Sequence, residues 1–139
     1  MSQVSVAKIT ESESNIVISV QIQGDGTGEL NKFVILSPSD LVPSRPNNDA
    51  TFRILEIWYG LAWFDVVLGF GTVLPQQAWT LARDGQNHIC LEEFGGMLDP
   101  NALITPPPDD NGRLWISTNG LVLGSKGSMA LELRKTNAP

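Results

Sequence analysis

The chain has little with which to build a disulfide scaffold or a nucleic acid-binding surface. It contains a single cysteine, so no disulfide within the chain can support the fold. Only nine residues are basic, and Arg134 and Lys135 are the one adjacent pair. Phosphate binding needs a continuous basic surface, and the formal net charge here is −6. These shortages exclude a disulfide-stapled domain and argue against nucleic acid as a partner.

Targeting and membrane signals are also missing from the sequence. Residues 1–14 lack the basic and apolar regions of a signal peptide, which predicts folding in a reducing cytoplasm. The longest apolar run, residues 54–71, contains Glu56 and Asp65 together with three glycines. Two carboxylates would be costly inside a bilayer. We therefore interpret this run as buried β-structure, and no membrane partner is expected.

What the sequence does contain is a series of short strand patterns. Residues 15–24 alternate, with Ile16, Ile18, Val20 and Ile22 on one face, as in a half-buried antiparallel strand. No sustained helical periodicity, internal repeat or domain break interrupts such patterns. The 139 residues therefore predict one all-β domain, an antiparallel β-sandwich or barrel of eight or nine short strands. We expect it to span residues 15–135, between a flexible N-terminal arm (1–14) and a frayed tail (136–139).

Glycine-marked corners predict how some of these strands connect. A hairpin is expected between residues 15–24 and 29–37. A second one is expected between residues 113–118 and 121–124, joined by Asn119 and Gly120, a pair typical of tight hairpin turns. Ser37 and Pro38 favour a short helical turn. Gly60 marks either a tight turn or a bulge within one long strand, and the sequence leaves both open.

The later part of the chain predicts three further strands. Residues 77–83 and 88–94 have strand composition, and 88–94 also alternates. The last strand, residues 129–135, should point Met129, Leu131 and Leu133 inward.

Few side chains are suited to catalysis. His88 and Cys90 would share one face of a strand, and Asp84 could orient the imidazole in a Cys–His pair. We favour a simpler interpretation, in which Cys90 is a small buried hydrophobic residue and His88 lies at the surface. Glu56 and Asp65 stand in apolar strands and could form a carboxylate pair, but such residues more often face solvent. No enzymatic activity is expected.

The sequence also contains few candidate metal ligands. One histidine and one cysteine cannot form a structural zinc site, and a cupin would need two histidines one residue apart. Calcium would need oxygen ligands, which four aspartates in glycine- or asparagine-rich corners could offer. In such corners aspartate normally serves turn geometry, so no metal or cofactor is predicted. The four are Asp25, Asp99, Asp109 and Asp110.

Four tryptophans in a chain of this length leave some for the surface. An exposed tryptophan is typical of a protein interface or of a surface on which a sugar ring stacks. Trp58 and Trp115 are the candidates for stacking.

The C-terminal half resembles a family of small virion proteins of tailed bacteriophages. The similarity covers residues 66–135 and is carried by "VVLGFGT", "QQAWTLARDGQNHICLEEFGG" and "NGRLWISTNGLVLGSKGSMALELRK". The resemblance implies a jelly-roll β-sandwich that acts as a capsid cement or decoration protein. Its partners would be the phage major capsid protein and further copies of itself, as a homodimer or homotrimer, on the surface of the virion.

Two proline-rich loops, residues 37–50 and 95–112, and the N-terminal arm are the expected contacts with the shell. The capsid-contact candidates in the loops are Leu41, Val42, Arg45, Met97, Leu98, Leu103 and Ile104. Two alternatives stay open: a tail, neck or fibre-base virion protein, and a carbohydrate-binding β-sandwich module.

Overall fold

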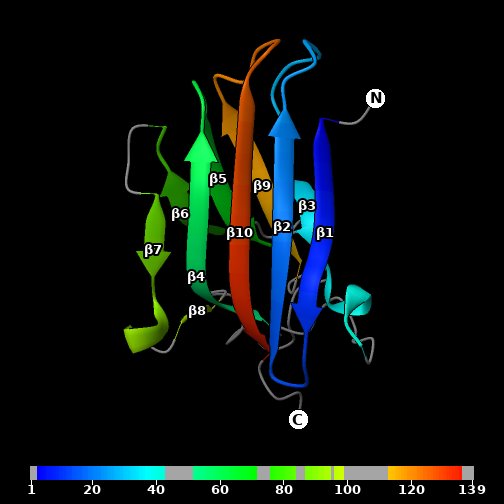
Figure 1. Cartoon of the computed structure of the whole chain (residues 1–139), viewed down its shortest axis with the longest axis vertical. Helices are drawn as coiled ribbons and strands as arrows, with labels where there is room; N and C mark the ends of the chain where they lie inside the picture. The colour runs from blue at the N-terminus through cyan, green and yellow to red at the C-terminus, as the bar shows by residue number, and fades with distance from the viewer. Residues whose placement is uncertain are drawn as a thin grey trace.

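The computed structural model describes residues 3–42, 52–71, 76–83, 87–94, 96–98 and 113–135. Two antiparallel β-sheets pack face to face (Figure 1). The strands are β1 (Val4–Glu11), β2 (Asn15–Gln23), β3 (Phe33–Leu36), β4 (Phe52–Leu61), β5 (Asp65–Phe70), β6 (Gln76–Leu81), β7 (His88–Cys90), β8 (Met97–Leu98), β9 (Leu114–Asn119) and β10 (Lys126–Lys135). Two 3-10 turns, η1 (Pro38–Asp40) and η2 (Glu92–Phe94), complete the described elements.

The strand order identifies the sandwich as a jelly roll. The first sheet, called sheet A, has the order β1-β2-β10-β4-β7, with β8 also paired to β4. The second, sheet B, has the order β3-β9-β5-β6. From β2 onward the chain crosses repeatedly from one sheet to the other, and every pairing is antiparallel. Two interlocked Greek keys of this kind define a jelly roll, so the predicted fold class is confirmed.

The core lies between the two sheets and follows the alternation read from the sequence. Ile16, Ile18, Val20 and Ile22 of β2 are buried, as predicted. Met129, Leu131 and Leu133 of β10 face the same interior. Sheet B supplies the opposing layer with Val66, Leu68, Phe70, Leu114 and Ile116, and Phe64 just before β5 is buried with them.

Both predicted hairpins are wrong. β3 pairs with β9 in sheet B and not with β2, whose neighbours are β1 and β10. Likewise the chain after Gly120 forms a corner, and the next strand, β10, belongs to sheet A. Alternation shows that each strand has a buried face. In a sandwich that face points into the same core from either sheet, so the pattern does not reveal which sheet a strand joins.

Three other predictions need correction. Residues 4–11 of the expected flexible arm form β1, which pairs with β2 along its whole length. The strand predicted over residues 88–94 ends at Cys90 and gives way to η2. At Gly60 there is neither a turn nor a bulge, because β4 continues to Leu61. The helical turn predicted at Pro38 is present as η1.

The two ends of the sandwich differ in construction. The upper end in Figure 1 carries the connections β2–β3, β4–β5 and β9–β10. The lower end carries the β1–β2 turn, η1 and the last residue of β10, Lys135. Residues 43–51, 99–112 and 136–139, including most of both proline-rich loops and the predicted tail, lie outside the described residues.

Candidate functional site

The predicted capsid contacts do not form one surface. Leu41 is only 3% exposed and belongs to the core, so it is not available to a partner. Val42 beside it is 71% exposed. Met97 and Leu98 pair with Ile54 and Arg53 at the start of β4, and the Met97 side chain is partly buried. Arg45, Leu103 and Ile104 lie outside the described residues.

Cys90 is exposed, which corrects the prediction that it is a buried hydrophobic residue. It lies on short β7 at the edge of sheet A, and the register places it opposite Glu56 on the outer side. Its Sγ lies 3.4 Å from Glu56 Oε1, and His88 Nε2 lies 3.9 Å from the same oxygen. His88 is at the surface, as predicted. Asp84, the proposed third member of a catalytic group, falls outside the described part.

Two carboxylates lie close to Cys90 in space, although their spacing in the sequence does not predict it. Ligand atoms of Glu56, Cys90 and Glu92 lie within 4.8 Å of one another. The pairing of β4 with β7 and the turn of η2 bring these three residues together, and no local sequence motif predicts it. A structural zinc site normally closes with four ligands, whereas this cluster has three, of which Cys90 and Glu92 are exposed and Glu56 is half-buried.

The other flagged carboxylates have structural partners. Asp65 Oδ1 accepts hydrogen bonds from the backbone N–H of Arg83 at 2.8 Å and from Arg83 Nε at 3.2 Å, and these bonds lower the pKa of Asp65. Asp65 is in sheet B and Glu56 in sheet A, so they do not form a pair. Asp25 accepts hydrogen bonds from the Thr27 amide and hydroxyl, which is ordinary turn geometry. Asp99, Asp109 and Asp110 lie outside the description.

The four tryptophans divide into one structural and three surface residues. Trp115 is 3% exposed and donates from Nε1 to the Gly71 carbonyl at 2.7 Å. A Cβ added at Gly69 would lie 2.1 Å from its ring, so glycine makes room for the indole. Trp115 is therefore part of the packing and not a surface for stacking. Trp58, Trp63 and Trp79 are exposed.

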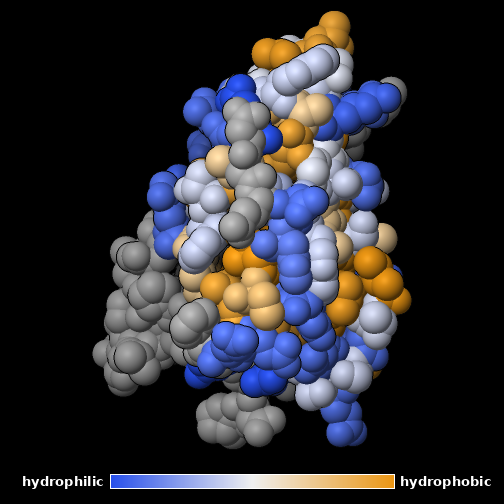
Figure 2. Space-filling view, turned by 60° about the vertical axis from the view of Figure 1, so that its left-hand side comes forward, coloured by the Kyte–Doolittle hydropathy of each residue, from blue (hydrophilic) through white to orange (hydrophobic). Residues whose placement is uncertain are grey.

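An apolar tip, defined as Trp63, Val122 and Leu123, occupies the upper end of the molecule. These side chains are 71%, 57% and 75% exposed. Figure 2 shows hydrophobic atoms at this end, where the β9–β10 corner protrudes. Trp63 has a φ of 73°, a left-handed conformation that large side chains rarely adopt. The fold therefore holds a strained backbone in place while leaving its indole in solvent.

The corner below the tip is ordered by one carboxylate. Glu29 accepts hydrogen bonds from the amides of Gly120 and Leu121 at 2.6 and 2.9 Å and from the Thr118 hydroxyl at 2.8 Å. Partial burial would raise the pKa of Glu29, but these bonds outweigh it and hold the pKa below its usual value. The β2–β3 connection and the β9–β10 corner are thus joined before any partner binds.

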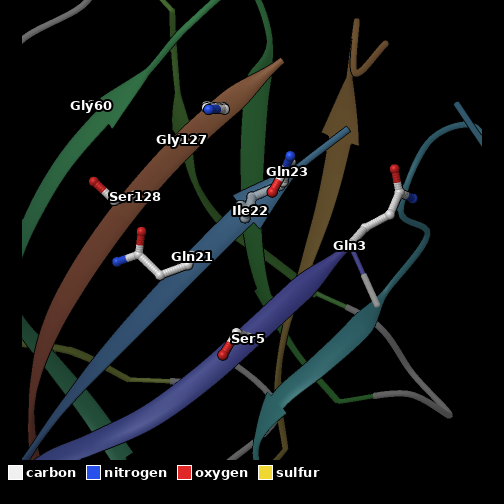
Figure 3. Close-up of a pocket in the computed structure, with 9 residues that line it drawn as sticks. Gln3, Ser5, Gln21, Ile22, Gln23, Gly60, Gly127 and Ser128 are labelled. Atoms are coloured by element: carbon white, nitrogen blue, oxygen red, sulfur yellow. The ribbon is translucent and has the colours of Figure 1, made fainter. Parts of the chain in front are cut away.

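The outward-facing side of sheet A is the second distinctive surface. Cross-strand register places Ser5, Gln21, Ser128 and Gly60 in one row. The next row contains Ala7, Ser19, Ala130, Trp58 and His88. The close-up in Figure 3 shows Ser5, Gln21 and Ser128 on neighbouring strands at this face. Most side chains of these rows are small or uncharged. The large rings of Trp58 and His88 lie together at one edge.

No protein-family model matches the chain, and neither does any curated protein or solved structure at a significant level. Both helices in the described part of the chain are single 3-10 turns, and neither could cross a membrane.

Proposed function

We propose that this protein is a non-catalytic virion structural protein that decorates a phage capsid and binds the shell through its apolar tip. The observation that carries the proposal is the exposure of Val122 and Leu123 on a corner that is already ordered, with Trp63 exposed on the β4–β5 connection beside it. Large apolar side chains exposed together on a soluble domain are typical of a protein interface. The resemblance of residues 66–135 to small phage virion proteins suggests the major capsid protein as the partner.

The energetics of the tip suit docking. Full burial of a large apolar side chain is worth about 1.5–3 kcal/mol, so three that are more than half exposed offer several kcal/mol to a partner. Because Glu29 fixes the corner beforehand, little of this is lost to ordering the loop. Attachment of many copies, or of an oligomer, to a repeating lattice would strengthen the binding further.

The proposal moves the main contact from the two proline-rich loops to the upper end. Leu41, one of the residues expected to touch the shell, lies in the core. Val42 is exposed at the opposite end, on the chain after η1. Val42 therefore serves as a matched control for the tip.

The test is co-sedimentation with shells assembled from the major capsid protein of the same genome, followed by counting of the bound copies. We expect saturable binding at many copies per shell, with shells that resist heat better once coated. Leu123→Ser should weaken binding at least tenfold, and Val42→Ser, which replaces an equally exposed side chain, should not. Binding limited to a single ring of copies would transfer the protein to a neck or tail. Absence of binding, or equal effects of the two variants, would reject the proposal.

A further inference from the structure

The outward-facing side of sheet A contains a shallow trough. Two adjoining depressions of about 430 and 440 Å³ share Gln21 and Ser128 in their lining and so form one continuous feature. The trough crosses β2, β10 and β4, the middle strands of the sheet (Figure 3). It is far larger than a water site, and it is an open depression rather than an enclosed cleft.

One wall of the trough is an indole with an open face. The Trp58 and His88 rings are stacked, with centroids 5.3 Å apart and an interplanar angle of 5°. This stacking covers one face of the indole and fixes its orientation. On the other side the register places Ala130, whose methyl group is too small to cover an indole. Trp58 is accordingly 38% exposed.

The floor of the trough is made of short polar side chains and a glycine. Gln21 Nε2 donates to Ser19 Oγ at 3.3 Å, which orients an amide and a hydroxyl side by side. Gly60 follows Trp58 on the same side of β4, and a Cβ built there would meet no atom within 4 Å. A Cβ at position 60 would therefore project into the trough without a clash in the sheet.

The charges around the trough restrict the chemical class of ligand that could bind there. In the two rows that form the floor and wall, His88 is the one titratable side chain, although the whole chain carries a net charge of −6. Glu56 and Glu132 lie in the next row, and Lys126 lies at the upper border of the trough. An ionic ligand would find no compensating charge on this floor, whereas neutral hydroxyl groups match its amides and hydroxyls.

We propose that this trough binds a neutral glycan, with one sugar ring stacked on the open face of Trp58. Sugar rings present flat C–H faces that pack on aromatic rings, and their hydroxyls pair with amide and hydroxyl side chains. Gln21, Ser19 and Ser128 supply these groups on the floor, and Asn87 lines the trough beside His88. The trough shares no lining residue with the apolar tip, so variants can test glycan binding and shell binding separately.

The test is affinity electrophoresis of the intact protein through gels containing a soluble β-glucan, mannan or galactan, with polygalacturonate as the anionic comparison. At least one neutral polysaccharide should retard the protein, and titration calorimetry with its oligosaccharides should give the affinity. Trp58→Ala should lower that affinity at least tenfold. Trp79→Ala is the matched control, because Trp79 is also 38% exposed but lies on sheet B, and it should leave the affinity unchanged.

A second variant separates loss of the ligand site from loss of the fold. Gly60→Ile adds a side chain suited to a strand and should fill the trough. It should abolish retardation while thermal unfolding and shell co-sedimentation stay as in the wild type. Retardation by polygalacturonate alone, no retardation by any neutral polysaccharide, or retardation that survives both Trp58→Ala and Gly60→Ile would overturn the proposal. None of these results would alter the outcome of the shell-binding experiment.

Discussion

Each end of the sandwich contains a carboxylate that accepts several hydrogen bonds, but the two carboxylates stabilise different parts of the molecule. At the upper end Glu29 binds backbone amides and a hydroxyl, and the corner that it orders carries exposed apolar side chains. At the lower end Glu11 Oε2 binds Lys135 Nζ at 2.6 Å and the Val42 amide at 2.7 Å. Lys135 is buried, and its Nζ also donates to the Ser12 carbonyl at 2.7 Å.

This difference separates stability from recognition. The lower-end ion pair joins β1, β10 and the chain after η1, so it secures elements that are distant in sequence. The upper-end carboxylate joins two short connections and shapes a surface. Damage at the lower end should therefore cost folding free energy, whereas damage at the upper end should mainly cost binding.

The largest effect is expected for Glu11→Ala. It leaves the Lys135 ammonium buried without its carboxylate, and removal of one partner from a buried pair costs about 3–5 kcal/mol. Because Glu11 is itself partly accessible, we expect about 3 kcal/mol less free energy of unfolding, measured by urea denaturation. Glu13→Ala, at an exposed neighbouring position, is the control and should change it by less than about 0.5 kcal/mol. Equal losses in the two variants would show that the pair does not stabilise the lower end.

Acid should remove much of the same stabilisation. Partial burial of Glu11 would raise its pKa, but hydrogen bonds from Lys135, the Val42 amide and Lys8 lower it to about 2 from an ordinary value of 4.5. A depressed pKa contributes stability that is complete above pH 4.5 and is lost as the pH falls toward 2. The urea midpoint of the wild type should fall through this window, and that of Glu11→Ala should fall less. Parallel pH profiles for the two proteins would contradict this assignment.

A smaller effect is expected for Glu29→Ala. The variant leaves the amides of Gly120 and Leu121 without this acceptor; the Gly120 amide is exposed and the Leu121 amide is partly buried, so the expected loss is about 1–2 kcal/mol. Shell binding should weaken as well, because the corner is no longer ordered in advance. Asp25→Ala is the matched control in the same connection, since Asp25 bonds to nearby Thr27, and it should preserve shell binding. If Glu29→Ala binds shells like the wild type, ordering of the corner is not needed for docking.

The smallest effect on stability should come from the tip itself. Trp63→Ala combined with Leu123→Ser changes side chains that are mostly in solvent, so the free energy of unfolding should move by less than about 0.5 kcal/mol. The same double variant should lose shell binding. Calorimetric melting and co-sedimentation on one preparation give both quantities. A substantial drop in stability would place the tip with the lower end, as part of the structural framework.

The sequence was most informative where the pattern within a single strand is enough to predict its buried face. Alternation in residues 15–24 predicted the buried face of β2, and the last strand was equally clear. The strand β1 was missed because an edge strand with mostly exposed side chains has the composition of a solvated arm. Pairing partners were missed because alternation contains no information on which sheet a strand joins.

The candidate sites show the same limit. Trp58 and His88 were each noted in the sequence, yet their stacking arises from the pairing of β4 with β7, which no local pattern predicts. Leu41 has the same hydrophobic character as Val42, and only packing shows that the first is buried and the second exposed. The tip was missed because residues 121–124 were interpreted as a strand, in which alternate side chains would have been buried.

The central pairing of β2 with β10 also determines when the protein can fold. Asn15 and Glu132, which are hydrogen-bonded in this pair, are 117 positions apart. A ribosome must therefore release almost all of the described chain before β2 can pair with β10, the last strand. Until then the isoleucines of β2 and the apolar face of β4 stay uncovered, and closure of so large a loop is slow. Production of the protein should accordingly depend on chaperones and growth temperature more than the stability of the finished fold would suggest.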